Sequence, residues 1–215
     1  NSNSSFSKGI TGTGTINIKN CLLNNATIKQ FNILITSSGT LNSNANNIDS
    51  NIINNGTLLF NGGTNNNTIT GTGLTQIYND VSNQANITQN ILEISANTNL
   101  TATITVKESL IINDTAKIIN DGKLIISSGT NNGIIEQNSN TSEMSIDKNL
   151  INNGTINQNT IRINNKLYLV ELDLSLEENY TKEEREEFFR EKEVYKVVRL
   201  DTLEREDKIY SCYSI

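Results

Sequence analysis

The stretch that decides the fold is Ile52-Ile53-Asn54-Asn55-Gly56-Thr57-Leu58. Two other segments superpose on it without gaps, Ile118-Ile119-Asn120-Asp121-Gly122-Lys123-Leu124 and Leu150-Ile151-Asn152-Asn153-Gly154-Thr155-Ile156. Each places paired aliphatic residues before an Asn-Gly or Asp-Gly corner and an alternating run after it, which predicts a strand, a turn and a second strand. Because Gly and Asn tolerate positive φ, we expect these tight corners to use it.

The repeats are unevenly spaced along the chain. The three corner motifs are separated by 66 and 32 residues, whereas residues 33–40 recur at 124–130 and residues 10–14 recur at 69–73. No single period fits these separations, so they favour stacked coils of variable length, a right-handed parallel β-helix, over a propeller. Asn-Gly between β runs is also typical of an antiparallel hairpin, but short runs with a recurring corner suit stacked coils better.

Composition fits a narrow solenoid core over residues 1–165. This part of the chain contains 37 of the 38 Asn, all 13 Gly and many Ile and Thr. We expect aliphatic side chains to stack from coil to coil inside, and corner Asn amides to form ladders. At ~20 to 24 residues per coil, about seven coils would give a rod of about 35 Å. The alternative is a disordered low-complexity chain, but aliphatic triplets such as Leu124-Ile125-Ile126 are rare in disorder.

Charge divides the chain near Asn165. Residues 1–165 contain 17 charged side chains, whereas residues 166–215 contain 23, and the net charge of the whole chain is -6. An acidic chain without a basic stripe is a poor partner for nucleic acid or an anionic membrane. No apolar run is long enough for a transmembrane helix, and no signal peptide opens the chain. The start at Asn1 suggests a piece of a longer or processed polypeptide.

The charged segment 166–215 predicts a small α+β unit. Residues 172–176 alternate like a strand, Thr181 and Glu184 have capping-box spacing before a helix that continues to about residue 193, and residues 194–200 and 208–213 predict two more strands. Such a unit could cap the open end of the solenoid. It could also be an interaction module, or an inserted sequence without an evolved role.

Residues 54–64, Asn-Asn-Gly-Thr-Leu-Leu-Phe-Asn-Gly-Gly-Thr, and residues 69–73, Ile-Thr-Gly-Thr-Gly, resemble the passenger region of bacterial autotransporter adhesins and related surface β-helix proteins. The resemblance covers most of residues 1–165. It implies a secreted or surface-exposed, elongated β-helix that mediates adhesion, and it supplies no catalytic residue. The C-terminal translocator barrel of that family has no counterpart in residues 166–215.

Catalytic chemistry is hard to place. The chain has no His, and the carboxylates of Glu108, Asp114 and Asp121 are scattered around a single Arg162 in the first 165 residues, without short-motif spacing. A β-helix enzyme that processes polysaccharides, or a phage tail protein, remains the alternative, and carboxylates meeting in a groove near Arg162 would favour it. No catalytic residue, cofactor or metal site is predicted. We expect Cys21 to be a small core residue.

Thr-x-Thr triplets raise a further alternative, an ice-binding solenoid with flat Thr ladders. They occur within residues 11–15, 70–72 and 101–105, at unequal steps that argue against one regular ladder. The leading hypothesis is therefore a non-enzymatic protein of the bacterial outer surface, or a secreted one. It would bind a host or neighbouring cell, a glycan or a matrix through an Asn/Thr-rich face, by many weak contacts. The binding residues cannot be named from the sequence.

Overall fold

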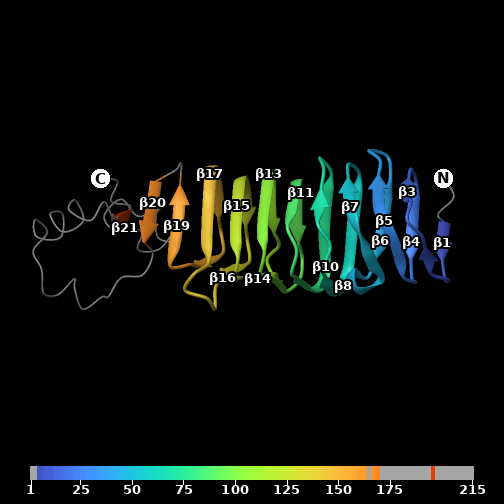
Figure 1. Ribbon diagram of the computed structural model, residues 1–215. Coiled ribbons are helices and arrows are strands. Elements are labelled where there is room, and N and C mark those ends of the chain that lie inside the picture. Colours follow the sequence, from blue (N-terminus) through green and yellow to red (C-terminus); the bar gives the residue numbers. More distant parts are fainter. Residues whose placement is uncertain (1–3, 164–165, 170–194, 197–215) are drawn as a thin grey trace, which may run out of the picture.

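The chain forms an elongated stack of parallel β-strands (Figure 1). The computed structural model describes residues 4–163, 166–169 and 195–196. One short 3-10 helix, η1 (Ala45–Asn47), lies among the strands. The strands are β1 (Ser4–Phe6), β2 (Ile10–Thr11), β3 (Thr15–Ile18), β4 (Cys21–Asn24), β5 (Ile28–Ile35), β6 (Thr40–Ser43), β7 (Ile48–Asn54), β8 (Thr57–Asn65), β9 (Ile69–Thr70), β10 (Leu74–Asn83), β11 (Ile87–Ile94), β12 (Thr98–Leu100), β13 (Thr103–Ile112), β14 (Lys117–Asn120), β15 (Lys123–Asn131), β16 (Ile134–Glu136), β17 (Glu143–Asn152), β18 (Thr155–Asn157), β19 (Thr160–Ile163), β20 (Lys166–Leu169) and β21 (Tyr195–Lys196).

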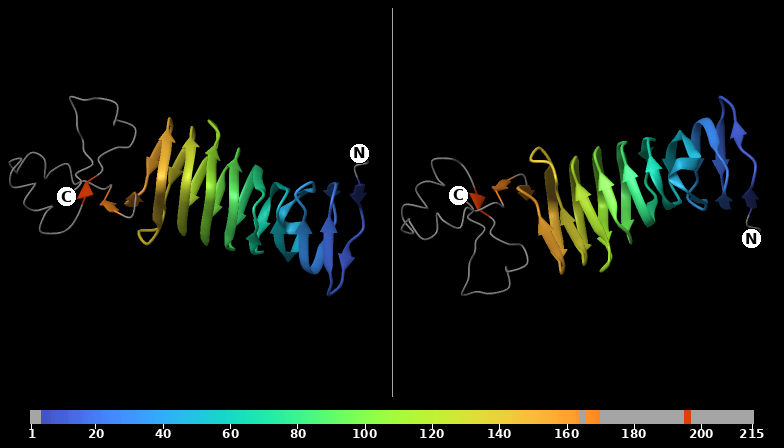
Figure 2. Two further views of the ribbon diagram at one scale, coloured as in Figure 1. Left: turned by 90° about the horizontal axis from the view of Figure 1, so that it is seen from above. Right: turned by 90° about the horizontal axis from the view of Figure 1, so that it is seen from below.

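The parallel pairing defines three sides of a solenoid. Every strand from β1 to β19 pairs in parallel with strands of the neighbouring coils, and the two turned views show the same stack (Figure 2). Side 1 consists of residues 4–6, 21–24, 40–43, 57–60, 74–77, 91–94, 109–112, 128–131 and 149–152. Side 2 includes residues 63–65, 81–83, 98–100, 117–120, 134–136 and 155–157. Side 3 consists of residues 15–18, 32–35, 51–54, 68–71, 86–89, 103–106, 123–126, 143–146 and 160–163.

The prediction of a mainly β parallel solenoid is confirmed, but the coils are shorter than expected. Paired positions are as little as 17 residues apart, as in Leu41 and Leu58, and as much as 21 apart, as in Gly129 and Leu150. The chain therefore makes about nine turns. At about 4.8 Å per coil, nine coils give a stack of about 43 Å.

The three corner motifs lie at three different corners, which explains their uneven spacing. Ile52 belongs to side 3, Ile118 to side 2 and Leu150 to side 1. The predicted strand, turn and strand are present in each, as β7 to β8, β14 to β15 and β17 to β18. The same sequence motif thus occurs at each of the three corners of a coil. The number of residues between two copies is therefore a number of whole coils plus a fraction of one coil.

The reason for glycine at these corners differs from the predicted one. The positive-φ glycines of the described chain are Gly62, Gly63 and Gly71, and Gly56 is not among them. A Cβ at Gly56 would instead overlap the backbone oxygen of Gly39 in the preceding coil, and Gly122 and Gly154 face the same kind of overlap. Glycine is required here because successive backbones pack closely.

Alternation along the strands fills a single aliphatic core. Side 3 points Ile33, Ile52, Ile69, Ile87 and Ile104 inward, all at most 1% exposed. Phe60 is also fully buried, on side 1, so the core holds an aromatic side chain among its aliphatic columns. The buried aliphatic columns exclude water along the whole stack, so they supply most of its stability.

Corner asparagines form the expected ladders. Asn65 Nδ2 donates to Asn83 Oδ1 at 2.6 Å, and Asn131 Nδ2 donates to Asn152 Oδ1 at 2.7 Å. All but Asn152 are fully buried. These bonds join adjacent coils at the ends of paired strands. They satisfy polar groups that burial would otherwise leave unpaired.

Cys21 is not a core residue, contrary to the prediction. Leu22 takes the inward position of β4, 5% exposed, and strand alternation directs its neighbour Cys21 outward, where it is partly exposed. Cys21 lies beside Thr40 on the outer surface of side 1. Its thiol therefore contributes nothing to the packing of the core.

The strand pairing changes from parallel to antiparallel after β19. The next strand, β20, pairs antiparallel with β19, with Ile161 opposite Tyr168, and β21 pairs with β20. The helix and the strands predicted for residues 172–193 and 208–213 lie outside the described residues. No helix in the described part of the chain is long and apolar enough to cross a membrane.

Candidate binding surface on side 3

Side 3 repeats a three-residue pattern in which an inward aliphatic residue separates two outward residues. In six consecutive coils the triplets begin at residues 15, 32, 51, 68, 86 and 103, and their middle residue is always Ile. Because side chains alternate along a strand, the first and third residues of every triplet point away from the core. They form two parallel rows along the solenoid axis.

These rows are almost entirely Asn and Thr. We call them the Asn/Thr surface. The first row is Thr15, Asn32, Asn51, Thr68, Asn86 and Thr103. The second row is Asn17, Leu34, Ile53, Thr70, Thr88 and Thr105. Leu34 and Ile53 are its only apolar members, and none of the twelve is charged. Successive rungs lie about 4.8 Å apart, so hydroxyl and amide groups recur at a regular spacing.

The surface ends where charged residues begin. In each of the three following coils one of the two outward side 3 positions is charged, and these residues are Lys123, Glu143 and Arg162. Arg162 Nε donates to Glu143 Oε1 at 2.5 Å, and Lys123 Nζ lies 3.3 Å from Glu143 Oε2. The hydrogen bond from Arg162, and secondarily the hydrogen bond and charge of Lys123, hold the pKa of Glu143 below its ordinary value, although partial burial raises it. This charged cluster marks one boundary of the Asn/Thr surface.

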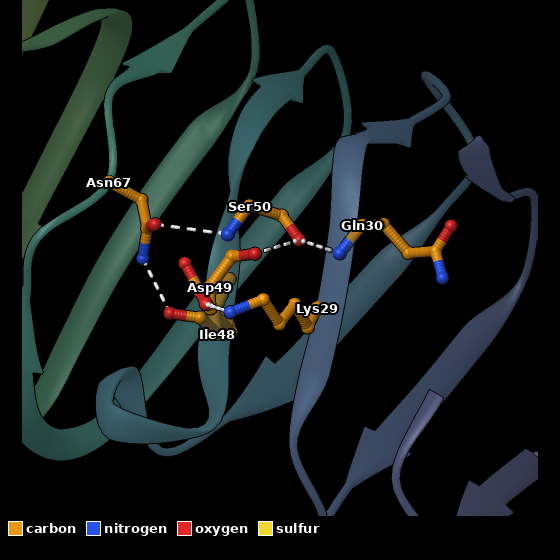
Figure 3. A network of polar contacts seen from close by, with 6 residues as sticks. All are labelled: Lys29, Gln30, Ile48, Asp49, Ser50 and Asn67. Carbon is orange, nitrogen blue, oxygen red and sulfur yellow. Dashed lines mark hydrogen bonds and ion pairs between the residues drawn. The ribbon is translucent and has the colours of Figure 1, made fainter. Parts of the chain in front are cut away.

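A polar network holds the chain as it turns into side 3 (Figure 3). The Gln30 N–H donates to Ser50 Oγ at 2.8 Å, and the Ser50 N–H donates to Asn67 Oδ1 at 3.0 Å. Asn67 Nδ2 donates in turn to the Ile48 carbonyl at 2.6 Å. Ser50 and Asn67 are 5% and 9% exposed. These bonds link three consecutive coils and fix the start of the side 3 rungs.

An exposed ion pair borders this network. Lys29 Nζ lies 3.0 Å from Asp49 Oδ2, and the two side chains are 64% and 63% exposed. Solvent screens such pairs strongly. The buried amide and hydroxyl bonds therefore position the rungs, and the ion pair contributes little to their geometry.

The structure places the three scattered carboxylates of the sequence analysis at three different corners. Glu108 lies between sides 3 and 1, where Asn90 Nδ2 donates to its Oε1 at 2.6 Å. Asp114 lies between sides 1 and 2, and Asp121 lies between sides 2 and 3, where its Oδ1 accepts from the Asn138 N–H at 2.7 Å. Arg162 pairs with Glu143, which the sequence did not single out. The described residues contain no cluster of three or more acidic or Cys side chains that could hold a metal ion.

The Thr triplets are more regular than their sequence positions indicated. Thr70 and Thr105 lie in the same row, with Thr88 between them in the intervening coil. The sequence separations between the Thr-x-Thr triplets are unequal because the triplets at residues 11–15 and 101–105 lie only partly on side 3. The argument from spacing against a regular Thr ladder is therefore wrong for these three coils.

Sequence reasoning missed the Asn/Thr surface as a set of residues, although a signal was present. Triplets made of a polar residue, an Ile and a second outward residue recur at steps of 17 to 19 residues. They begin at Thr15, Asn32, Asn51, Thr68, Asn86 and Thr103. An assumed coil of ~20 to 24 residues is too long to reveal that step.

No protein-family model, curated protein or solved structure matches the chain. The function therefore has to be inferred from the surface itself.

Proposed function

We propose that the chain is a non-enzymatic binding solenoid, exposed on a bacterial surface or secreted, like the adhesins that its rungs resemble. Its ligand would be a glycan, a matrix component or a neighbouring cell surface. The observation that carries the proposal is the Asn/Thr surface, in which ten of the twelve outward positions of six coils carry uncharged hydrogen-bonding groups.

The mechanism follows from repetition. A single exposed hydroxyl or amide contact contributes only about 0.5 to 1.5 kcal/mol. A rigid row of such groups can engage a repetitive ligand at many points at once, so avidity replaces individual affinity. Because no charge stands on the surface, binding should depend weakly on salt.

Hydrolysis fits this arrangement less well. A polysaccharide-processing site needs two carboxylates held about 5 to 10 Å apart. Glu108, Asp114 and Asp121 lie at separate corners of the triangle, and the nearest guanidinium on side 3, Arg162, is engaged by Glu143. A groove-based enzyme is therefore not the function we propose.

One specific observation favours a second candidate, ordering of water at ice. Thr70, Thr88 and Thr105 occupy one outward row in three consecutive coils, and Thr68 and Thr103 lie in the adjacent row. Only three coils share this feature, and Asn interrupts the first row. Thermal hysteresis of the purified chain tests this candidate directly, and a freezing-point gap above that of an unrelated protein would favour it.

The experiment that tests the leading proposal is an array of neutral and acidic glycans and matrix proteins, probed with the full chain at low and high salt. We expect binding to neutral, repetitive ligands that survives high salt. Binding confined to acidic ligands and lost in high salt would contradict the proposal.

A further inference from the structure

The outer surface of side 1 has a different character from that of side 3. Its first row consists of Cys21, Thr40, Thr57, Leu74, Ile91, Ser109, Ser128 and Asn149. Its second row consists of Leu23, Asn42, Leu59, Gln76, Glu93, Ile111, Thr130 and Ile151. Of these sixteen residues only Glu93 is charged, and seven are apolar or Cys. Sheet faces that combine this apolar share with so few charges are typical of surfaces that pack against another protein.

The order of polar and apolar residues along these rows is symmetric about the midpoint between the coils of Leu74 and Ile91. Counting outward from that point, the second row reads Gln, Leu, Asn, Leu in one direction and Glu, Ile, Thr, Ile in the other. The first row reads Leu, Thr, Thr, Cys in one direction and Ile, Ser, Ser, Asn in the other. Within these eight coils only the outermost pair, Cys21 and Asn149, breaks the symmetry. Ser5 of β1 lies beside Leu23, beyond the eight coils, and has no counterpart at the other end of the described rows.

A two-fold axis requires the same surface to be complementary to itself. We infer that side 1 is a self-association surface, on which a second copy of this chain packs face to face with its solenoid axis antiparallel. The dimer axis passes between the coils of Leu74 and Ile91.

The antiparallel arrangement matches polarity in seven of eight facing pairs. Leu74 faces Ile91 of the second copy, Leu59 faces Ile111 and Leu23 faces Ile151. The polar pairs are Gln76 with Glu93, Thr57 with Ser109, Thr40 with Ser128 and Asn42 with Thr130. An amide opposite Glu93 gives that carboxylate a donor in the interface, in addition to Gln76 Nε2 of its own chain at 2.7 Å.

The parallel arrangement fits poorly. With the two solenoid axes parallel, each coil faces itself and the first row meets the second. Leu74 would then face Gln76, Ile91 would face Glu93 and Leu59 would face Thr57, so that apolar groups would be buried against polar ones. The sequence of side 1 therefore selects the antiparallel dimer.

The area of the surface sets the strength of the dimer. Eight coils about 38 Å long and four residues about 13 Å wide give a footprint of about 500 Å² per copy. Two copies would bury about 1,000 Å², at the lower limit of specific interfaces, so we expect a weak dimer that dissociates on dilution. Packing side 1 inward leaves the Asn/Thr surface of both copies exposed, so the dimer would double the number of binding surfaces.

The test is sedimentation velocity of the full chain over a dilution series, on the wild type and on charge-swap variants. Leu59 and Ile111 lie three coils apart within one chain, too far for an ion pair, but face each other in the antiparallel dimer. We expect L59E alone and I111K alone to weaken dimerisation at least tenfold, and the double variant L59E/I111K to recover most of it. A matched control, I53E/I125K on side 3, should dimerise like the wild type.

Three outcomes would overturn the inference. They are a wild type that stays at the monomer mass of 23.7 kDa at every concentration, single variants that dimerise as well as the wild type, and a double variant that recovers nothing. Circular dichroism melts confirm that each variant folds, since all four positions point outward.

Discussion

Asn54 and Gln89 lie in coils two apart, yet Asn54 Nδ2 donates to Gln89 Oε1 at 2.9 Å inside the core. Both side chains are completely buried. They meet because Gly71 occupies the inward position of the coil between them and brings no side chain. A glycine thus allows two amides to satisfy each other in the interior of side 3.

This relationship predicts a large effect of Gly71→Ala on folding. Gly71 has φ of +123°, and a Cβ there would overlap the carbonyl group of Asn54. We expect the free energy of unfolding to fall by about 2 to 4 kcal/mol. Gly14→Ala is the matched control, since its Cβ would meet only the Gln30 side chain at 3.8 Å. Urea unfolding of both variants measures the difference, and equal losses would contradict this explanation of the glycine.

The network at the start of side 3 predicts opposite behaviour for two adjacent residues. Ser50→Ala removes the acceptor of the partly buried Gln30 N–H, so it should cost about 1 to 3 kcal/mol. Asp49→Asn removes only the exposed pair with Lys29, and should cost less than about 0.5 kcal/mol. Chemical denaturation ranks the two. A larger loss in Asp49→Asn would mean that the ion pair, not the buried bond, fixes the start of the rung.

Glu143 predicts a pH dependence of stability. Its pKa is lowered in the folded chain, chiefly by the hydrogen bond from Arg162. A carboxylate of this kind contributes stability above its unfolded pKa, and that contribution is lost as the pH falls through the folded pKa. In Glu143→Gln the loss of stability between neutral and acid pH should therefore be shallower than in the wild type. Parallel pH profiles of unfolding free energy in the two proteins would show that the Arg162 bond does not contribute.

Much of the fold can be predicted from the sequence because its corners carry strong local signals. The strand-turn-strand motifs around Gly56, Gly122 and Gly154 are present where expected. Their assignment to three different corners could not be predicted, because it depends on the length of every coil between them. The role of these glycines could not be predicted either, because a local sequence pattern does not show which backbones of neighbouring coils lie close together.

The Asn/Thr surface was predicted in kind but not in residues. Asn and Thr abundance indicated a polar face, whereas only the pairing register shows that Thr70, Thr88 and Thr105 share a row. The outward position of Cys21 also depends on register, because a shift of one residue exchanges the two faces of a strand. The hydrogen bond between Asn54 and Gln89 could not be predicted from the sequence, because it depends on how the coils stack.

The central claim is that the Asn/Thr surface binds the ligand, and the most direct test removes its hydroxyls without changing its shape. The triple variant Thr70→Val, Thr88→Val and Thr105→Val keeps β-branched side chains on the strands. Its control carries the same change at Thr64, Thr115 and Thr155, which lie outside side 3.

Titration of both variants against the strongest ligand from the glycan and matrix array is the decisive measurement. The account predicts that the side 3 variant binds at least roughly tenfold more weakly than the wild type, a loss of about 1.4 kcal/mol, while the control binds normally. Unchanged affinity in the side 3 variant, or an equal loss in the control, would contradict it.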